Sequence, residues 1–263
     1  MLRVAMKKRA PWRLLRGMAA SVVLSAALWG CTMPSTSTPV DSAGLATIHK
    51  IALIPPAEPA LYELRWNMSY VLPLERLGTQ AFLPNGNPLP PNETVDTFRA
   101  NLVKENVVLG SDLATDTAAA LRKQGYEVVI VPADHPKPAA FLTDLSALRD
   151  RPDMAGVDAV LDLVIPRAGY AHAVHHYYNP AIRLDTRLTA LSTGGTINRQ
   201  LAQRTYYYVD PVAIRASDLK IPAEAGYDFK DGGKLLAEPD RAAKGLRSGL
   251  PHLADAVAAD LKR

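Results

Sequence analysis

The stretch IRLDTRLTALSTGGTINRQLAQRTYYYV, residues 182–209, decides the fold. From 182 to 190, apolar residues alternate with charged or polar ones, and this period of two is typical of a half-buried strand. Ser-Thr-Gly-Gly at 192–195 predicts a hairpin turn. Residues 196–209 then return as the antiparallel partner. We therefore expect a long antiparallel hairpin with one face in the core.

Shorter apolar stretches on the amino-terminal side of this hairpin predict three further strands. They are IHKIALI at 48–54, YEVVIV at 126–131 and VLDLVI at 160–165. The almost continuous apolar character of 126–131 favours a buried central strand. The segment 62–72 fits either a strand or a short helix, and 210–237 is expected to be irregular.

Helical periodicity appears in three segments. Apolar residues recur at helical spacing after Ser111 or Asp112, either of which can cap a helix that runs to Gln124 and ends at Gly125. A short helix is expected at 138–149. A terminal helix is expected at 240–262, kinked or restarted at Pro251. The fold class predicted is therefore an α/β (α+β) sandwich, in which helices pack on a mixed sheet with a long antiparallel hairpin.

The amino terminus has the composition of an export signal. Residues 18–30 carry no charge, and the next residue, Cys31, is the only cysteine of the chain. An uncharged stretch this short does not comfortably span a bilayer, which needs about 20 apolar residues. Upstream, residues 1–17 hold no acid and six basic residues, which favour retention on the cytoplasmic side: Arg3, Lys7, Lys8, Arg9, Arg13 and Arg16.

Leu28, Gly30 and Cys31 resemble the bacterial lipobox, from which Trp29 departs. The resemblance implies cleavage between Gly30 and Cys31, a thioether-linked diacylglycerol on the Cys31 thiol, and acylation of the freed amino group by a fatty acid such as palmitate. The alternative is an uncleaved membrane anchor with a chance cysteine. Thr32 stands where aspartate usually retains a lipoprotein in the inner membrane. The resemblance therefore implies an outer-membrane lipoprotein that faces the periplasm.

This processing changes the charge balance. The chain has 30 basic and 26 acidic residues, and six of the basic ones precede Cys31. Residues 31–263 therefore carry 24 basic and 26 acidic groups, a formal net charge of −2. No basic run interleaved with aromatic residues follows Cys31, so we expect no nucleic-acid binding.

The domain organisation expected has three parts. Residues 1–30 form the signal peptide. Residues 31–47, rich in Ser, Thr and Pro, form a flexible tether. Residues 48–263 form a single periplasmic α/β domain with a Pro-rich insertion at about 73–91.

Three places in this domain resemble a known fold. They are 48–56, the Gly-Val-Asp-Ala of 156–159 followed by 160–165, and the hairpin at 184–194 with its returning strand. Together they resemble the fold of the TolB amino-terminal domain, LpoB and CsgG, and more broadly outer-membrane lipoproteins of this fold. The resemblance implies an envelope protein that binds, assembles or activates another envelope protein. It also implies that a subclass forms homo-oligomers.

Two clusters are candidate sites. His172, His175 and His176 could bind a metal, because neutral imidazoles are ligands for zinc, copper or nickel. The alternative is a solvated hairpin tip. The second cluster could be a partner-binding face, since tyrosine is enriched at interfaces, or it could be cross-strand aromatic packing. Its members are Tyr177, Tyr178, Tyr206, Tyr207 and Tyr208.

The sequence lacks the motifs of the common enzyme classes, such as G-x-S-x-G, H-E-x-x-H and the phosphate-binding glycine loop. Asp158 and Asp162 are interpreted as strand-end caps rather than an acid–base pair. We therefore expect a non-enzymatic protein without a cofactor, held at the membrane by its lipid. The alternative is a periplasmic lipoprotein that binds a metal or small ligand through the histidines.

Overall fold

A mixed sheet forms the centre of the domain. The computed structural model describes residues 38–59, 62–66, 92–172, 177–191, 198–208 and 219–263. The strands are ordered in space as β3 (Glu127–Ile130), β1 (Lys50–Ile54), β4 (Ala159–His172), β5 (Tyr178–Ala190), β6 (Arg199–Tyr208) and β7 (Leu219–Ile221). A further strand, β2 (Tyr62–Trp66), also pairs with β4.

The strand pairings confirm the predicted α/β class and mixed sheet. β1 runs parallel to both β3 and β4, whereas β4, β5 and β6 are antiparallel. β5 and β6 are the predicted hairpin, although the turn at 192–195 lies outside the described residues. β4 and β5 form a second long antiparallel pair, which extends from Ala159 opposite Ala190 to His172 opposite Tyr178.

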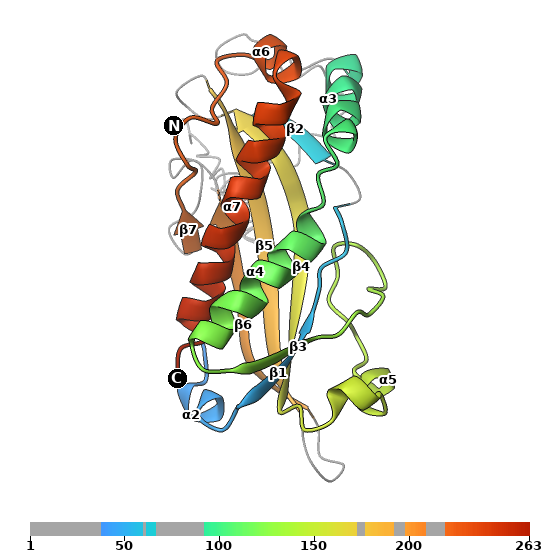
Figure 1. Ribbon diagram of the computed structural model, residues 1–263, viewed down its shortest axis with the longest axis vertical. Coiled ribbons are helices and arrows are strands. Elements are labelled where there is room, and N and C mark those ends of the chain that lie inside the picture. The colour runs from blue at the N-terminus through green and yellow to red at the C-terminus, as the bar shows by residue number, and fades with distance from the viewer. Residues whose placement is uncertain (1–37, 60–61, 67–91, 173–176, 192–197, 209–218) are drawn as a thin grey trace, which may run out of the picture. The chain divides into compact units, whose positions relative to one another are not determined.

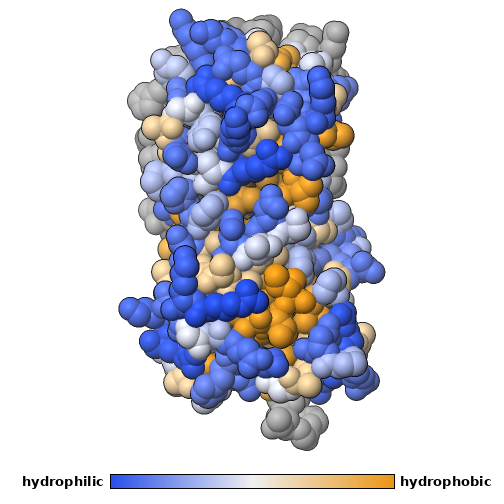
Figure 2. Space-filling view, in the orientation of Figure 1, coloured by the Kyte–Doolittle hydropathy of each residue, from blue (hydrophilic) through white to orange (hydrophobic). Residues whose placement is uncertain are grey.

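One face of the sheet carries the long helices α3 (Asn92–Lys104), α4 (Leu109–Lys123) and α7 (Pro239–Asp260), which lie in front of it in Figure 1. α7 packs on β5 and β6, and α4 packs on β1 and β3 and against α7. α3 contacts β2, α7 and α6 (Gly232–Ala237). Figure 2 shows a compact hydrophobic patch in the lower half of this otherwise largely polar side.

The second face is covered in part by the segment 131–157. This segment contains α5 (Ser146–Arg149) and the 3-10 turn η3 (Pro152–Met154). Because side chains alternate along a strand, Ile51 and Leu53 of β1 point into the helix-side core. Ala52 and Ile54 point instead into a second, smaller core beneath this segment. The sheet is thus buried on both faces at strand β1.

The central position predicted for 126–131 is wrong. β3 is an edge strand, and within the described ranges only β1 pairs with it. Its apolar run arises because Val128 packs under the helices while Val129 borders the second core. Ile130 is left 38% exposed.

Three helix predictions also need correction. α4 begins at Leu109, and its start is capped by neither Ser111 nor Asp112. Instead, the Glu58 carboxylate accepts hydrogen bonds from the backbone N–H groups of Leu109 (3.0 Å) and Gly110 (2.6 Å). Within 138–149 only α5 is helical, and α3 was not predicted at all. The helix end at Gly125, with φ +88°, agrees with the expected position. The terminal helix is confirmed, but it is one continuous helix and is not restarted at Pro251.

The tether predicted for 31–47 is wrong from residue 38 onward. Thr38 forms an antiparallel bridge with Gln203. Asp41 caps the short helix α2 (Ser42–Leu45), and Leu45 is buried in the helix-side core. The folded domain therefore begins upstream of the expected boundary. Residues 31–37 and the Pro-rich stretch 73–91 lie outside the described residues.

Two further segments had uncertain or irregular structure expected from the sequence. Residues 62–66 of the segment 62–72 form the strand β2. The region 210–237, expected to be irregular, contains β7 and α6. In the part of the chain that the structure describes, no helix is long and apolar enough to cross a membrane.

Candidate functional site

The five candidate tyrosines do not form one surface. The side chains of Tyr178, Tyr206 and Tyr208 are buried in the helix-side core, whereas Tyr207 is half-buried and Tyr177 is 41% exposed. The β5–β6 register places Tyr208 opposite Ile182, so strand pairing does not bring the two tyrosine groups together. The partner-binding role is therefore wrong for the three buried tyrosines and stays a prediction for Tyr177 and Tyr207.

Glycines of α7 make room for Tyr208 and for a further buried tyrosine, Tyr170 of β4. A Cβ at Gly249 would overlap the Tyr208 ring, and a Cβ at Gly245 would overlap the Tyr170 hydroxyl. The buried hydroxyls have partners, as buried polar groups require. The Tyr206 hydroxyl donates to Asp260 Oδ2 (2.9 Å) on α7. Burial, followed by the nearby Asp260 charge, raises the pKa of Tyr206 well above its usual value. These rings therefore dock α7 on the sheet.

The opposite face of the sheet carries a row of polar side chains, which we call the strand-face strip. Its members are Arg183, Asp185 and Arg187 of β5, with Thr205 and Tyr207 of β6. The three β5 residues share a face because they lie two apart along the strand. The strip runs from the small core beneath 131–157 toward a part of the sheet where Tyr207 packs on Ala171 and Ala181.

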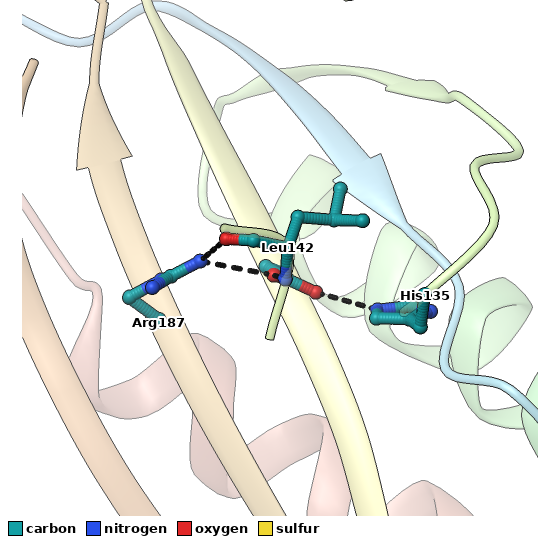
Figure 3. Close-up of polar contacts among 4 residues, drawn as sticks. His135, Leu142 and Arg187 are labelled. Atoms are coloured by element: carbon teal, nitrogen blue, oxygen red, sulfur yellow. Dashed lines mark hydrogen bonds and ion pairs between the residues drawn. The ribbon is translucent and has the colours of Figure 1, made fainter. Parts of the chain in front are cut away.

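At one end of the strip, the buried carboxylate of Asp162 clamps the covering segment onto the sheet (Figure 3). Asp162 Oδ1 lies 2.8 Å from His135 Nε2, and both side chains are almost fully buried. Asp162 Oδ2 accepts the backbone N–H of Leu142 (2.8 Å) and lies 3.3 Å from Arg187 Nη2. Arg187 also donates to the Leu142 carbonyl, and its guanidinium lies 4.7 Å from the centre of the Phe141 ring.

This cluster suits a structural role better than an acid–base role. The two Asp162 oxygens face three partners from β5 and the covering segment. The interpretation of Asp162 as a strand-end cap is wrong, because it lies within β4 and is 1% exposed. For Asp158 that interpretation is confirmed, since its Oδ2 accepts from the N–H groups of His49 (2.7 Å) and Lys50 (2.8 Å) at the start of β1.

An ion pair and hydrogen bonds also connect the residues in the middle of the strip. Arg183 Nε and Nη2 bind the two carboxylate oxygens of Asp185 at 3.0 and 2.8 Å, the fork geometry that holds a guanidinium rigidly. The Thr205 hydroxyl donates to Asp185 Oδ1 (2.8 Å). The guanidinium carbon of Arg183 lies 5.9 Å from the centre of the Tyr207 ring. The strip is thus a set of fixed charges and hydrogen-bonding groups.

Sequence reasoning did not predict the strip, although its alternating charges were visible in 182–190. The pattern showed which β5 residues share a face, but not that this face lies away from the helices. The sequence did not indicate that His135 and Leu142 contact Asp162, because they lie 27 and 20 residues away from it along the chain.

The other candidate residues are only partly placed. His172 ends β4 opposite Tyr178, but His175, His176 and the His172 side chain lie outside the described residues. Gly30 and Cys31 lie outside them as well. Where the structure is described, no group of three or more His, Cys, Asp or Glu side chains could hold a metal ion. Metal binding by the three histidines stays a prediction.

Comparisons with known proteins give little further information. No family model matches the sequence, and no curated protein matches it. Among solved structures, the PelC dodecamer from Paraburkholderia phytofirmans is similar over 80% of this chain and 94% of that chain, with 14% sequence identity and a TM-score of 0.29. A likeness of this size assigns neither an assembly nor a function to the chain.

Proposed function

We propose that this chain is a non-catalytic, lipid-anchored protein of the bacterial outer membrane, whose domain faces the periplasm and binds another envelope protein. The observation that carries the proposal is the arrangement around Cys31. Six basic residues and then thirteen uncharged residues that end in Leu-Trp-Gly precede the only cysteine. Two or more acyl chains on this cysteine would attach the protein stably, at about 0.8 kcal/mol per buried methylene group.

The strand-face strip is the surface that best fits partner binding. The long helices that pack closely on the sheet, α4 and α7, lie on the other face. Arginine and tyrosine, both present in the strip, are the residue types enriched at interface hot spots. The Arg183 fork on Asp185 fixes one of these side chains before a partner arrives. Such pre-organisation lowers the entropic cost of binding.

The fixed polar groups favour binding over catalysis. A catalytic centre needs a nucleophile or base within hydrogen-bond reach of a reacting atom. The carboxylates of Asp185 in the strip and of Asp162 at its end are engaged by arginine and other donors. These interactions hold elements of the domain together, which supports a scaffold rather than an enzyme.

Photo-cross-linking in intact cells tests the contact surface. A benzophenone amino acid at Tyr207 should give a discrete cross-linked species with an envelope protein. The same probe at Ala119, an exposed position of α4 on the helix face, serves as the matched control. Equal cross-linking from both positions, or none from Tyr207, would exclude the strip as the partner-binding surface.

A further inference from the structure

An additional arginine, Arg167, extends the strip across three strands. The strand registers place Arg167 opposite Arg183, and Arg183 opposite Tyr207. A bulge in β4 between Val164 and Arg167 creates this row. Regular alternation from Val164 would turn Arg167 toward the helices, but the extra residue of a bulge re-aims the side chains that follow it. Arg167 therefore shares the face of Arg183.

The charge of Arg167 is not neutralised by its described surroundings. Arg183, its cross-strand neighbour, has the same charge, and like charges directly opposite each other are destabilising. Arg183 has a counter-charge in Asp185. No ion pair or hydrogen bond joins half-buried Arg167 to any residue of the described ranges. Glu63 lies nearby and has polar interactions of its own, but it makes no ion pair with Arg167.

The surface beside Arg167 contains a small depression. It is lined by Glu63, Arg167 and small residues that include Gly169, Ala171 and Ala181. At Gly169, with φ +152°, a Cβ would overlap the Glu63 backbone, so only glycine allows β2 to pass this close to β4 beside the depression. A small-molecule site encloses most of its ligand. A depression this small and only partly enclosed instead suits a single side chain that projects from the surface of a protein.

We propose that the row Arg167–Arg183–Tyr207 docks an acidic segment of the partner protein, and that Arg167 binds one of its carboxylates. This inference rests on the function proposed above and adds the chemistry of the partner. A guanidinium binds a carboxylate through two parallel hydrogen bonds. The incoming negative charge would also relieve the repulsion between the two arginines. Tyr207, packed on Ala171 and Ala181, supplies an aromatic contact beside that site.

Binding of a fluorescent decaglutamate peptide to the full chain in detergent tests the proposal. Arg167→Glu should raise the Kd for the peptide about tenfold or more, since tenfold corresponds to the loss of one charge pair of ordinary strength. Arg167→Gln should raise it less, and Arg167→Lys should retain most of the binding. Lys123→Glu, a charge reversal at an exposed position on α4, should leave the Kd within about twofold of the unsubstituted value.

Two outcomes would overturn the proposal. One is an equal Kd for the unsubstituted chain and for Arg167→Gln, when circular dichroism shows that both are folded. The other is tighter binding of polygalacturonate, or of phosphatidylglycerol vesicles, than of the peptide. Failure of this inference is distinguishable from failure of the proposed function. If the Tyr207 cross-link survives Arg167→Glu at unchanged yield, the partner binds there without the charge. If the unsubstituted chain gives no such cross-link, the surface itself is wrong.

Discussion

Gly249 of α7 lies directly against the ring of Tyr208, with no room between them for a methyl group. Tyr208 is 0% exposed, and its hydroxyl lies 3.2 Å from Ser248 Oγ of the same helix. That hydroxyl also accepts the backbone N–H of Glu224 at 2.8 Å. Close packing of α7 on β6 therefore removes one of the predicted partner-binding tyrosines from the surface.

Gly249→Ala should destabilise the domain. Alanine gains about 1 kcal/mol over glycine in a helix interior, but overpacking a filled core costs about 1–3 kcal/mol. We expect a net loss in the free energy of unfolding, measured by urea denaturation. Gly232→Ala is the matched control, because a Cβ there meets nothing within 4 Å. An unchanged midpoint for Gly249→Ala would contradict the packing described between α7 and Tyr208.

Asp162→Asn should weaken the clamp that holds the segment 131–157. The substitution removes the charge that faces His135 and Arg187, and breaking a buried pair costs about 3–5 kcal/mol. We expect a lower urea midpoint and faster proteolysis within 132–145. Asp153→Asn, which removes a more exposed partner of Arg151, should change the free energy of unfolding by about 0.5 kcal/mol or less. Equal effects of the two substitutions would argue against the clamp.

Asp116 should make stability depend on pH in an unusual direction for a carboxylate. Burial, followed by the charges of Asp112 and Asp255, raises the pKa of Asp116. The folded state therefore favours the protonated form. The charged form of Asp116 lowers the free energy of unfolding. This loss is absent below the unfolded pKa of 3.8 and is complete once the pH has risen through the folded pKa. Asp116→Asn should stabilise the protein at pH 7 and have no effect near pH 3. Stabilisation of the same size at both values would refute this origin.

Glu58 should stabilise α4 across a long sequence distance. Its carboxylate binds the first two N–H groups of the helix, and loss of a helix cap costs about 0.5–2 kcal/mol. Glu58→Ala should lower the free energy of unfolding by this amount, measured with urea. Glu224→Ala, at an exposed position, should have little effect. A Glu58→Ala variant as stable as this control would exclude the capping role.

Local patterns in the sequence predicted some elements well. The alternation in 182–190 identified β5 and its polar face, because one side of that strand is buried and the other is not. α3 could also have been predicted, because Val95, Phe98 and Leu102 recur at helical spacing. Phe98 and Leu102 are indeed buried. The long Pro-rich stretch before it obscured this signal.

Other features depend on contacts between distant residues, which local patterns do not report. The cap of α4 comes from Glu58, 51 residues upstream of Leu109. The burial of Tyr208 depends on a glycine in the last helix. The edge position of β3 follows from the order in which parallel strands pair, and an apolar run looks the same at an edge as at the centre.

Mass spectrometry of the amino terminus of the purified, membrane-derived protein tests the central claim most directly. We expect the first residue to be Cys31, carrying a thioether-linked diacylglycerol and an acylated amino group, and we expect Cys31→Ala to prevent this processing. A mature protein that begins upstream of residue 31, or that carries no acyl chain on Cys31, would contradict the account.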